Sequence, residues 1–147
     1  MITIIQAEEE HISLLIPLLD SYRIFYKQNS NEKAVKNFLE ARLQNKDSVI
    51  FIAYFNNTPA GFVQLFSSFS TVSLKPLYIL NDLYVSHEYR KKGIGELLLN
   101  RAQDHCKFMG YKGLSLETAT NNPAQKLYER LGWEKDTNFY HYFWKAD

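Results

Sequence analysis

Cysteine, glycine, proline, long apolar runs and excess charge are all scarce in this sequence, and each scarcity excludes a class of protein. The single cysteine, Cys106, cannot form a disulfide within the chain, so a disulfide-rich secreted scaffold is excluded. Six glycines and four prolines in 147 residues are far too few for a collagen-like chain. No run of about 18 apolar residues occurs, so we expect no membrane-spanning helix. Seventeen basic and sixteen acidic residues leave a net charge of +1, without the basic excess of a dedicated nucleic-acid binder.

Apolar residues make up 46% of the sequence and aromatic residues 15%, which is typical of a folded protein with an aromatic excess. A chain of this length buries roughly 70% of its extended-chain surface on folding. We therefore expect residues 1–147 to form one domain. The opening segment Met1–Gln6 runs directly into Glu8–Glu10, which is unlike a signal peptide. We expect a cytoplasmic protein that does not bind to a membrane.

The spacing of apolar residues predicts a mixed α/β domain, with antiparallel hairpins first and a parallel crossover later. Strands are expected over residues 2–6, 48–54, 60–66, 77–85, 114–118 and 139–144. Helices are expected over residues 8–26, 30–43, 94–109 and 122–131. We expect Ser30 to cap the second helix, and Pro17 to kink or split the first. Residues 67–76 fit either a loop over a site or an extension of the hairpin.

The most informative segment is the turn between the strand at 77–85 and the helix that follows. Gly93 and Gly95 lie where that helix begins, and glycine lets the backbone approach a ligand closely. The first amides of a helix have no acceptor within it, and the helix dipole adds positive potential there. Such a turn is an anion site well suited to a pyrophosphate, and the basic residues 90–92 add charge at the same place.

Other kinds of glycine-rich turn need residues that this segment lacks. A phosphate-binding P-loop needs a Lys-Ser/Thr pair after its last glycine, and here Glu96 follows Gly95. A dinucleotide fingerprint needs a third glycine, and that position is Leu98. An ordinary strand-to-helix turn with solvated basic side chains stays open as the plain alternative.

Two motifs in this sequence resemble one protein family. Arg-x-x-Gly-x-Gly at residues 90–95 is similar to the acyl-CoA-binding motif of the GNAT superfamily of N-acetyltransferases. Residues 121–133 look like the same family's asparagine, short helix, tyrosine and terminal glycine–aromatic pair. The resemblance covers residues 78–133 and implies a single GNAT-like domain with a mixed central sheet flanked by helices on both faces. It also implies acetyl-CoA as cosubstrate and no metal.

The resemblance further implies which residues hold the cosubstrate. In the family the pyrophosphate lies on amides of the glycine turn, and the pantetheine arm pairs with the preceding strand beside a bulge. An asparagine of the second motif, Asn121 here, contacts the pantetheine. The residues implied in cofactor binding are Leu83, Tyr84, Val85, Arg90, Lys91, Lys92, Gly93, Ile94, Gly95, Glu96, Asn121 and Tyr128.

Tyr128 matches the tyrosine that acts as general acid in this family. When an amine attacks a thioester, the departing thiolate benefits from a proton, and a phenol with an ordinary pKa of about 10 can supply it within hydrogen-bond reach. Helical spacing also places Tyr128 on the apolar side of its short helix with Leu127 and Leu131. On the residues alone, a core tyrosine is the simpler interpretation.

The general base is less clearly indicated. Polyamine acetyltransferases of the superfamily carry Glu-Asp where this chain has Asn81 and Asp82, so the usual glutamate is missing. Successive side chains of a strand point to opposite faces, so Asp82 is not expected simply to replace that glutamate. Asp82, Glu117 on the neighbouring strand, or a chain of water molecules could each accept the proton.

The acceptor is expected to be a small-molecule amine or a lysine-bearing peptide. Tyr22 and Tyr26 form an aromatic cluster that, with Asn81, Asp82 and Glu117, would suit a cation, although aromatic stripes at helical spacing are more often core. Residues 22–26 and 81–83 are similar to those of a histone- and polyamine-type branch of the family, and this similarity implies an amine acceptor. A coenzyme A-binding module without transferase activity is the alternative, because the usual glutamate is absent.

Three further expectations concern metal, redox chemistry and assembly. The four histidines show no metal-ligand spacing, so we expect no metal site. Cys106 falls on the apolar stripe of its helix and is expected in the core. The aromatic segment 140–144 resembles an edge that needs covering, and GNAT proteins are often dimers, so a homodimer is expected.

Overall fold

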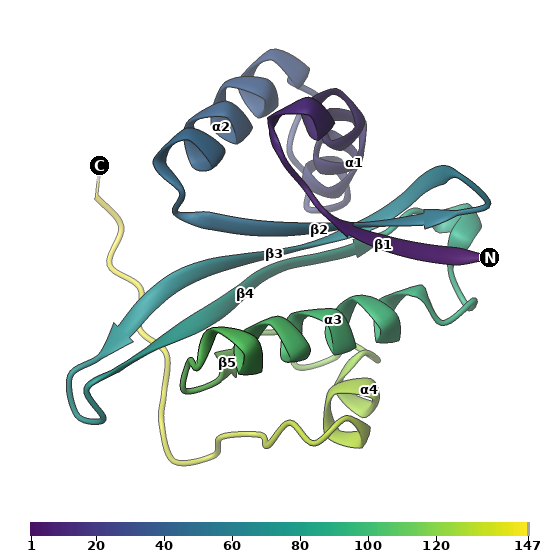
Figure 1. The fold of residues 1–147 in the computed structure, drawn as a ribbon. Coiled ribbons are helices and arrows are strands. Elements are labelled where there is room, and N and C mark those ends of the chain that lie inside the picture. Colours follow the sequence, from purple (N-terminus) through teal and green to yellow (C-terminus); the bar gives the residue numbers. More distant parts are fainter. Residues whose placement is uncertain (147) are drawn as a thin grey trace. The chain divides into compact units, whose positions relative to one another are not determined.

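The chain divides into two compact units, Met1–Glu117 and Thr118–Asp147, and the computed structural model describes residues 1–146. The first unit contains a five-stranded sheet in the order β1-β2-β3-β4-β5 (Figure 1). Its strands are β1 (Ile2–Gln6), β2 (Ser48–Phe55), β3 (Thr58–Ser70), β4 (Lys75–Val85) and β5 (Leu114–Ser115). Neighbours from β1 to β4 are antiparallel, whereas β4 and β5 are parallel. This is the mixed sheet that the sequence predicts.

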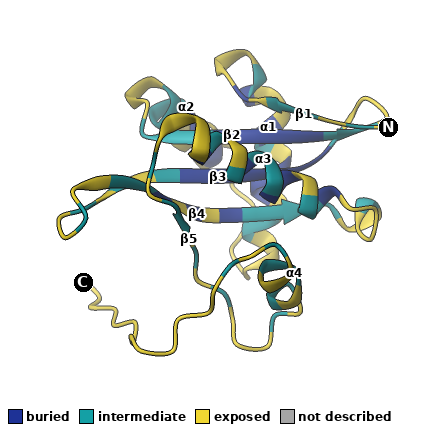
Figure 2. Cartoon of the chain, turned by 60° about the horizontal axis from the view of Figure 1, so that its bottom comes forward, coloured by how far each residue is buried: buried dark blue, intermediate teal, exposed yellow. Residues whose placement is uncertain are grey.

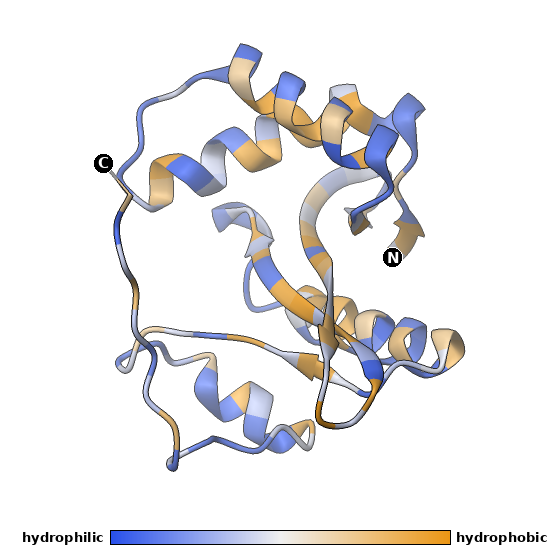
Figure 3. Ribbon diagram, turned by 90° about the vertical axis from the view of Figure 1, so that its left-hand side faces the viewer, coloured by the Kyte–Doolittle hydropathy of each residue, from blue (hydrophilic) through white to orange (hydrophobic). Residues whose placement is uncertain are grey.

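Helices cover both faces of the sheet, as predicted. The first unit contains η1 (Glu9–His11), α1 (Ile12–Phe25), α2 (Glu32–Asn45), η2 (His87–Tyr89) and α3 (Ile94–Met109). Helices α1 and α2 lie on one face and α3 lies on the other (Figure 1). Each helix alternates hydrophilic and hydrophobic residues along its length (Figure 3), so one side can be buried while the other meets solvent.

The apolar core lies on both faces of the sheet, because successive side chains of a strand point to opposite faces. On one face Ile50 and Phe62 pack with Leu15 of α1 and Leu39 of α2, and all four side chains are fully buried. On the other face the ring of Phe51 lies under α3, where Arg101 sits 4.5 Å over it. Buried residues therefore concentrate in the sheet and on the inner sides of the helices (Figure 2).

Two hairpins join β2, β3 and β4. The first turns at Asn56 and Asn57, which both have positive φ, as a tight two-residue hairpin turn requires. The second shows that residues 67–76 are an extension of the hairpin rather than a loop, because β3 continues to Ser70 and β4 begins at Lys75. Between them, the tip Thr71–Leu74 exposes apolar side chains to solvent.

Helix α1 and its connection to α2 differ from the prediction at two residues. Pro17 lies inside α1 and does not split it. Asn31 rather than Ser30 caps α2, accepting a hydrogen bond from the Ala34 amide. Ser30 instead donates its hydroxyl to the buried carboxylate of Asp20 at 2.6 Å, and the Asn31 amide donates to the same carboxylate at 2.8 Å. These hydrogen bonds hold the pKa of Asp20 below its ordinary value in spite of burial.

Strand β5 is shorter than predicted. It covers Leu114–Ser115 instead of residues 114–118, because its parallel pairing with β4 involves only Tyr78 and Ile79. The helix before it matches the prediction: α3 ends at Gly110, whose left-handed φ of 70° terminates the helix. Cys106 is buried on the inner side of α3, as expected, and burial raises the pKa of its thiol.

The second unit contains the short helix α4 (Gln125–Arg130). The predicted start at Asn122 is a turn instead, in which the Asn122 side chain accepts a hydrogen bond from the Ala124 amide. Gly132 closes the helix as predicted, with φ of 93°, and the next amide, of Trp133, donates to the Tyr128 carbonyl at 3.0 Å.

The predicted strand at 139–144 is wrong. The structure has no strand there, and the large apolar side chains of the segment are 80–90% exposed. Aromatic residues favour strands, but a strand forms only when a neighbour satisfies its backbone hydrogen bonds. In the described part of the chain the sheet ends at β5, without a sixth strand. Within residues 1–146, none of the helices is long and apolar enough to cross a membrane.

Candidate active site

The turn between β4 and α3 leaves helix amides available to a ligand. Gly93 is the N-cap residue of α3 and has a left-handed φ of 83°, which glycine adopts without strain. Lys91 is also left-handed, with φ of 63°. No side chain caps this helix end, so the amides of Ile94 and Gly95 point out of the helix without an internal acceptor.

The space over this turn is open. A Cβ atom placed on Gly93 or on Gly95 would meet nothing within 4 Å. The side chains of Lys91 and Lys92 are exposed beside it. An open turn with outward amides, the positive end of a 16-residue helix and nearby lysines fits a pyrophosphate, so these residues can hold coenzyme A.

Arg90 braces the same turn from the side of β4. Its Nε donates to the carbonyl oxygen of Val85 at 2.9 Å. Its guanidinium lies 5.7 Å from the ring of Phe25 and 5.8 Å from that of Tyr84. The residue that the sequence places among the cofactor ligands therefore also ties the end of β4 to the turn.

The outer edge of β4 becomes free before the turn. Parallel pairing with β5 involves only Tyr78 and Ile79. Across the segment Leu83–Val85 the described chain has no strand on that side, while β3 pairs with the opposite edge. An extended molecule could therefore pair with this edge as a strand would.

A bulge in β4 lies at Asn81, a few residues before the segment Leu83–Val85. Gln64 of β3 pairs with Asp82, and the next residue, Leu65, pairs with Leu80, so Asn81 is the extra residue. The expectation that Asn81 and Asp82 face opposite sides is wrong for this reason. The Nδ2 of Asn81 lies 3.1 Å from both carboxylate oxygens of Asp82, and both residues line one cavity.

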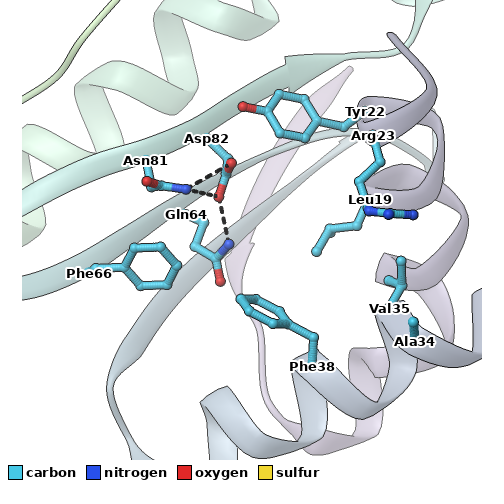
Figure 4. Close-up of a pocket in the computed structure, with 10 residues that line it drawn as sticks. All are labelled: Leu19, Tyr22, Arg23, Ala34, Val35, Phe38, Gln64, Phe66, Asn81 and Asp82. Atoms are coloured by element: carbon cyan, nitrogen blue, oxygen red, sulfur yellow. Dashed lines mark hydrogen bonds between the residues drawn. The ribbon is translucent and has the colours of Figure 1, made fainter. Parts of the chain in front are cut away.

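This cavity has a volume of about 340 Å³ and lies between α1, α2, β3 and β4 (Figure 4). Its lining residues are Leu19, Tyr22, Arg23, Ala34, Val35, Phe38, Gln64, Phe66, Asn81 and Asp82. Of the acceptor residues expected from the sequence, Tyr22, Asn81 and Asp82 are brought together here. Tyr26 is not among the lining residues, although its ring packs edge-on against Tyr22 at 5.0 Å, and the exposed Glu117 is not among them either.

The resemblance to the family implies that the first two helices contribute to the acceptor side, but the α2 residues that line the cavity were not predicted individually. Phe38 and its neighbours belong to the apolar stripe that marks α2 as amphipathic, and such a stripe indicates core packing rather than a site. Phe38 is nevertheless 46% exposed. The exposure of this aromatic residue sets it apart from the buried residues of the stripe. Exposure depends on the fold, so the sequence alone gives no signal for it.

Asp82 is the chemical centre of the cavity. Its side chain is 9% exposed, and Gln64 Nε2 donates to one carboxylate oxygen at 2.6 Å. Gln64 is itself held by the hydroxyl of Ser48, which donates to Oε1 at 2.7 Å. Burial, and then the Asp82 carboxylate beside it, raise the pKa of Tyr22 well above its ordinary value, so its hydroxyl stays protonated beside this carboxylate. This hydrogen-bond network holds the Asp82 carboxylate at a fixed position in a largely apolar cavity.

In the second unit, Tyr128 is half-buried on α4 and its ring lies 5.8 Å from that of Trp133. Asn121 is exposed in the turn before this helix. Residues 1–146 hold no group of three or more histidine, cysteine or acidic side chains arranged to bind a metal ion.

Comparison with known proteins identifies the family. The profile of the acetyltransferase (GNAT) family matches residues 15–133. An uncharacterized N-acetyltransferase of Bacillus subtilis (strain 168), YhfO, is 46% identical over 138 residues, 93% of each chain. The crystal structure of a probable acetyltransferase covers 99% of this chain and 98% of its own, with a TM-score of 0.92 and 38% identity. The chain belongs to the GNAT family.

Membership makes the chain an enzyme, an acyltransferase of the N-acetyltransferase class. The fold extends to more distant proteins. A predicted acetyltransferase of Clostridium acetobutylicum, solved with acetyl-CoA, has a TM-score of 0.78 at 19% identity, covering 97% of this chain and 96% of its own. At that identity the likeness is one of fold.

Proposed function

We propose that this enzyme transfers an acetyl group from acetyl-CoA to a primary amine by direct attack of the amine on the thioester. The carbonyl carbon gains a bond to nitrogen and loses its bond to sulfur. The ammonium loses one proton before attack, because only the neutral amine is a nucleophile, and nitrogen loses a second as the amide forms. One of these two protons balances the one taken up by the thiolate, and the other is released to solvent. The observation that carries the proposal is the open anion site of the glycine turn at one end of β4, with a buried carboxylate on the same strand. We propose residues 1–147 as one catalytic domain.

Acetyl-CoA supplies the activated acetyl group. The amides of residues 91–96 and the lysines beside them hold its pyrophosphate, and the backbone of Leu83–Val85 binds the pantetheine arm along the free edge of β4. Asn121 contacts the same arm. The fold neighbour that contains acetyl-CoA and the resemblance of residues 90–95 to the acyl-CoA motif both support this assignment.

Two side chains handle the protons. The Asp82 carboxylate attracts the acceptor ammonium and accepts its proton, because it is the negative group of the cavity and the bulge turns it inward. Tyr128 donates its phenolic proton to the departing thiolate. The family motif supports the second assignment, whereas the similarity to histone- and polyamine-type enzymes contributes only the amine acceptor.

Thiol release from acetyl-CoA across a panel of amines tests this function. The panel contains monoamines, polyamines, aminoglycosides, lysine peptides and free amino acids. We expect release with at least one class and acetylated amine as the second product. Silence across the panel, with acetyl-CoA still bound, would instead support a coenzyme A-binding module without transferase activity.

The Gly95→Ala variant tests the donor site. The added methyl group meets no protein atom within 4 Å and stands on the turn to which we assign the pyrophosphate. We expect acetyl-CoA affinity measured by calorimetry to fall by about tenfold or more, the equivalent of one good charged hydrogen bond. Folding should not suffer, since alanine is favoured over glycine in a helix by up to about 1 kcal/mol.

The matched control is Gly113→Ala, before β5, where an added Cβ also meets nothing within 4 Å. Neither glycine has a left-handed backbone, so both variants should melt at or above the wild-type temperature. Equal acetyl-CoA affinity in the two variants would remove the turn from the donor site.

We also propose a cytoplasmic homodimer. The large apolar side chains of residues 139–144 are 80–90% exposed, and contiguous exposed apolar surface marks a contact with another molecule. Light scattering coupled to gel filtration should give twice the chain mass of 17.2 kDa, and Phe143→Ser with Trp144→Ser should lower it. A monomer mass for the wild type would contradict the dimer. The single buried thiol is consistent with a reducing compartment.

A further inference from the structure

The charges around the acceptor cavity are few. Among the ten described residues that line it, Asp82 is the one carboxylate and Arg23 the one cation. Arg23 is held in place, since Nη1 donates to the Asn29 carbonyl at 3.0 Å and lies 3.9 Å from Asp20. The cavity therefore offers one counter-charge to an ammonium group, and a second ammonium would meet a positive side chain.

Away from Arg23 and from the polar cluster of Tyr22, Gln64, Asn81 and Asp82, the walls are apolar. Leu19 of α1 and Val35 and Phe38 of α2 face the sheet, where Phe66 of β3 lies beside the polar cluster (Figure 4). The body of an acceptor whose amine reaches Asp82 would lie against these side chains. Apolar atoms gain about 25 cal/mol for each Å² removed from water, whereas a charge buried there without a partner is strongly disfavoured.

We propose that the acceptor of this enzyme is a small primary monoamine with an apolar body, bound by its ammonium at Asp82 and by its body between α2 and β3. This proposal rests on the proposed transfer to a primary amine and names the class of that amine. A volume of about 340 Å³ is at the small end of ligand pockets, which suits such a molecule better than an aminoglycoside, whereas charge rather than size disfavours a polyamine.

A matched pair of substrates isolates the effect of a second ammonium group. Pentylamine and 1,4-diaminobutane have the same chain length, but the terminal methyl group of the first is a second ammonium in the second. In the cavity that group would meet apolar walls and Arg23. We expect kcat/KM for pentylamine to exceed that for 1,4-diaminobutane by at least about tenfold, because no second carboxylate lines the cavity to offset desolvation of the extra charge.

The Phe66→Glu variant should reverse part of this preference. It adds a carboxylate to the apolar wall at a half-buried position, so the ratio of the two kcat/KM values should shift toward the diamine by about tenfold. Phe69→Glu is the control, because Phe69 belongs to the same strand, is 80% exposed and does not line the cavity. The ratio of the two kcat/KM values in the wild type tests the proposal by itself, whether or not either variant folds.

The outcomes separate this proposal from the function on which it rests. Thiol release with 1,4-diaminobutane, an aminoglycoside or a blocked lysine peptide at a kcat/KM equal to or above that of pentylamine would overturn the monoamine proposal alone. If none of the amines tested supports thiol release, the proposed function and the acceptor class are both overturned. A folded Phe66→Glu enzyme with the wild-type ratio would remove the wall between α2 and β3 from acceptor selection.

Discussion

The Tyr128→Phe variant is expected to release coenzyme A thiol about 10²- to 10³-fold more slowly than the wild type, with little change in acetyl-CoA affinity. Phenylalanine keeps the aromatic ring that lies 5.8 Å from Trp133 and removes only the hydroxyl. Without the phenolic proton, the sulfur must leave as a free thiolate or take its proton from water. The loss should therefore appear in kcat, because binding of the donor precedes proton transfer.

Single-turnover measurement of thiol release, beside calorimetric titration with acetyl-CoA, separates the two quantities. Tyr140→Phe is a suitable control, since Tyr140 is 90% exposed in the C-terminal segment and its hydroxyl has no assigned role. An unchanged rate in Tyr128→Phe would remove Tyr128 from the mechanism. It would then leave the packing against Trp133 as the function of this side chain.

The conformation of the turn between β4 and α3 could be predicted closely because its determinants are local. Gly93 and Gly110 both adopt left-handed backbone at the two ends of α3, and each end depends on residues within one turn of the helix. The open space over Gly95 follows from the same short segment. Residues that interact within a few positions leave a pattern in the sequence.

The cavity between α1, α2, β3 and β4 depends on contacts between distant residues, and its lining could be predicted only in part. Asn81 and Asp82 face one cavity because of the register between β3 and β4. The sequence of β4 contains no residue pattern that indicates the bulge. Phe38 enters the site from α2, which the sequence marks as an ordinary amphipathic helix. Both depend on how separate elements pack.

The segment 139–144 shows the limit of propensity in a different way. Its aromatic residues favour a strand, yet the described chain contains no strand there. A strand needs a neighbouring edge, and whether one is supplied is a property of the assembly rather than of the segment. The proposed dimer would supply such a neighbour, so the wrong prediction and the proposed assembly concern the same six residues.

The Asp82→Asn variant is expected to lower kcat/KM for the acceptor amine by about 30-fold to several thousand-fold, since loss of one partner of a buried charge pair costs about 2–5 kcal/mol. The carboxylate is 9% exposed, and none of the other described residues that line the cavity is an acid that could replace it. An amide of the same shape still fills the site between Gln64 and Asn81, but it neither attracts an ammonium nor accepts its proton.

Asp82→Asn must be distinguished from a general loss of structure, because the amide replaces an acceptor of two hydrogen bonds from β3 and β4. Thermal melting and acetyl-CoA affinity serve this purpose, since the donor turn at Gly93 and Gly95 does not contact Asp82 through any hydrogen bond of the network. Asp104→Asn, an exposed acid on α3, is the matched control for loss of one negative charge. Wild-type kcat/KM in a folded Asp82→Asn enzyme would contradict its role, whereas a loss confined to the amine would place the acceptor ammonium at this carboxylate.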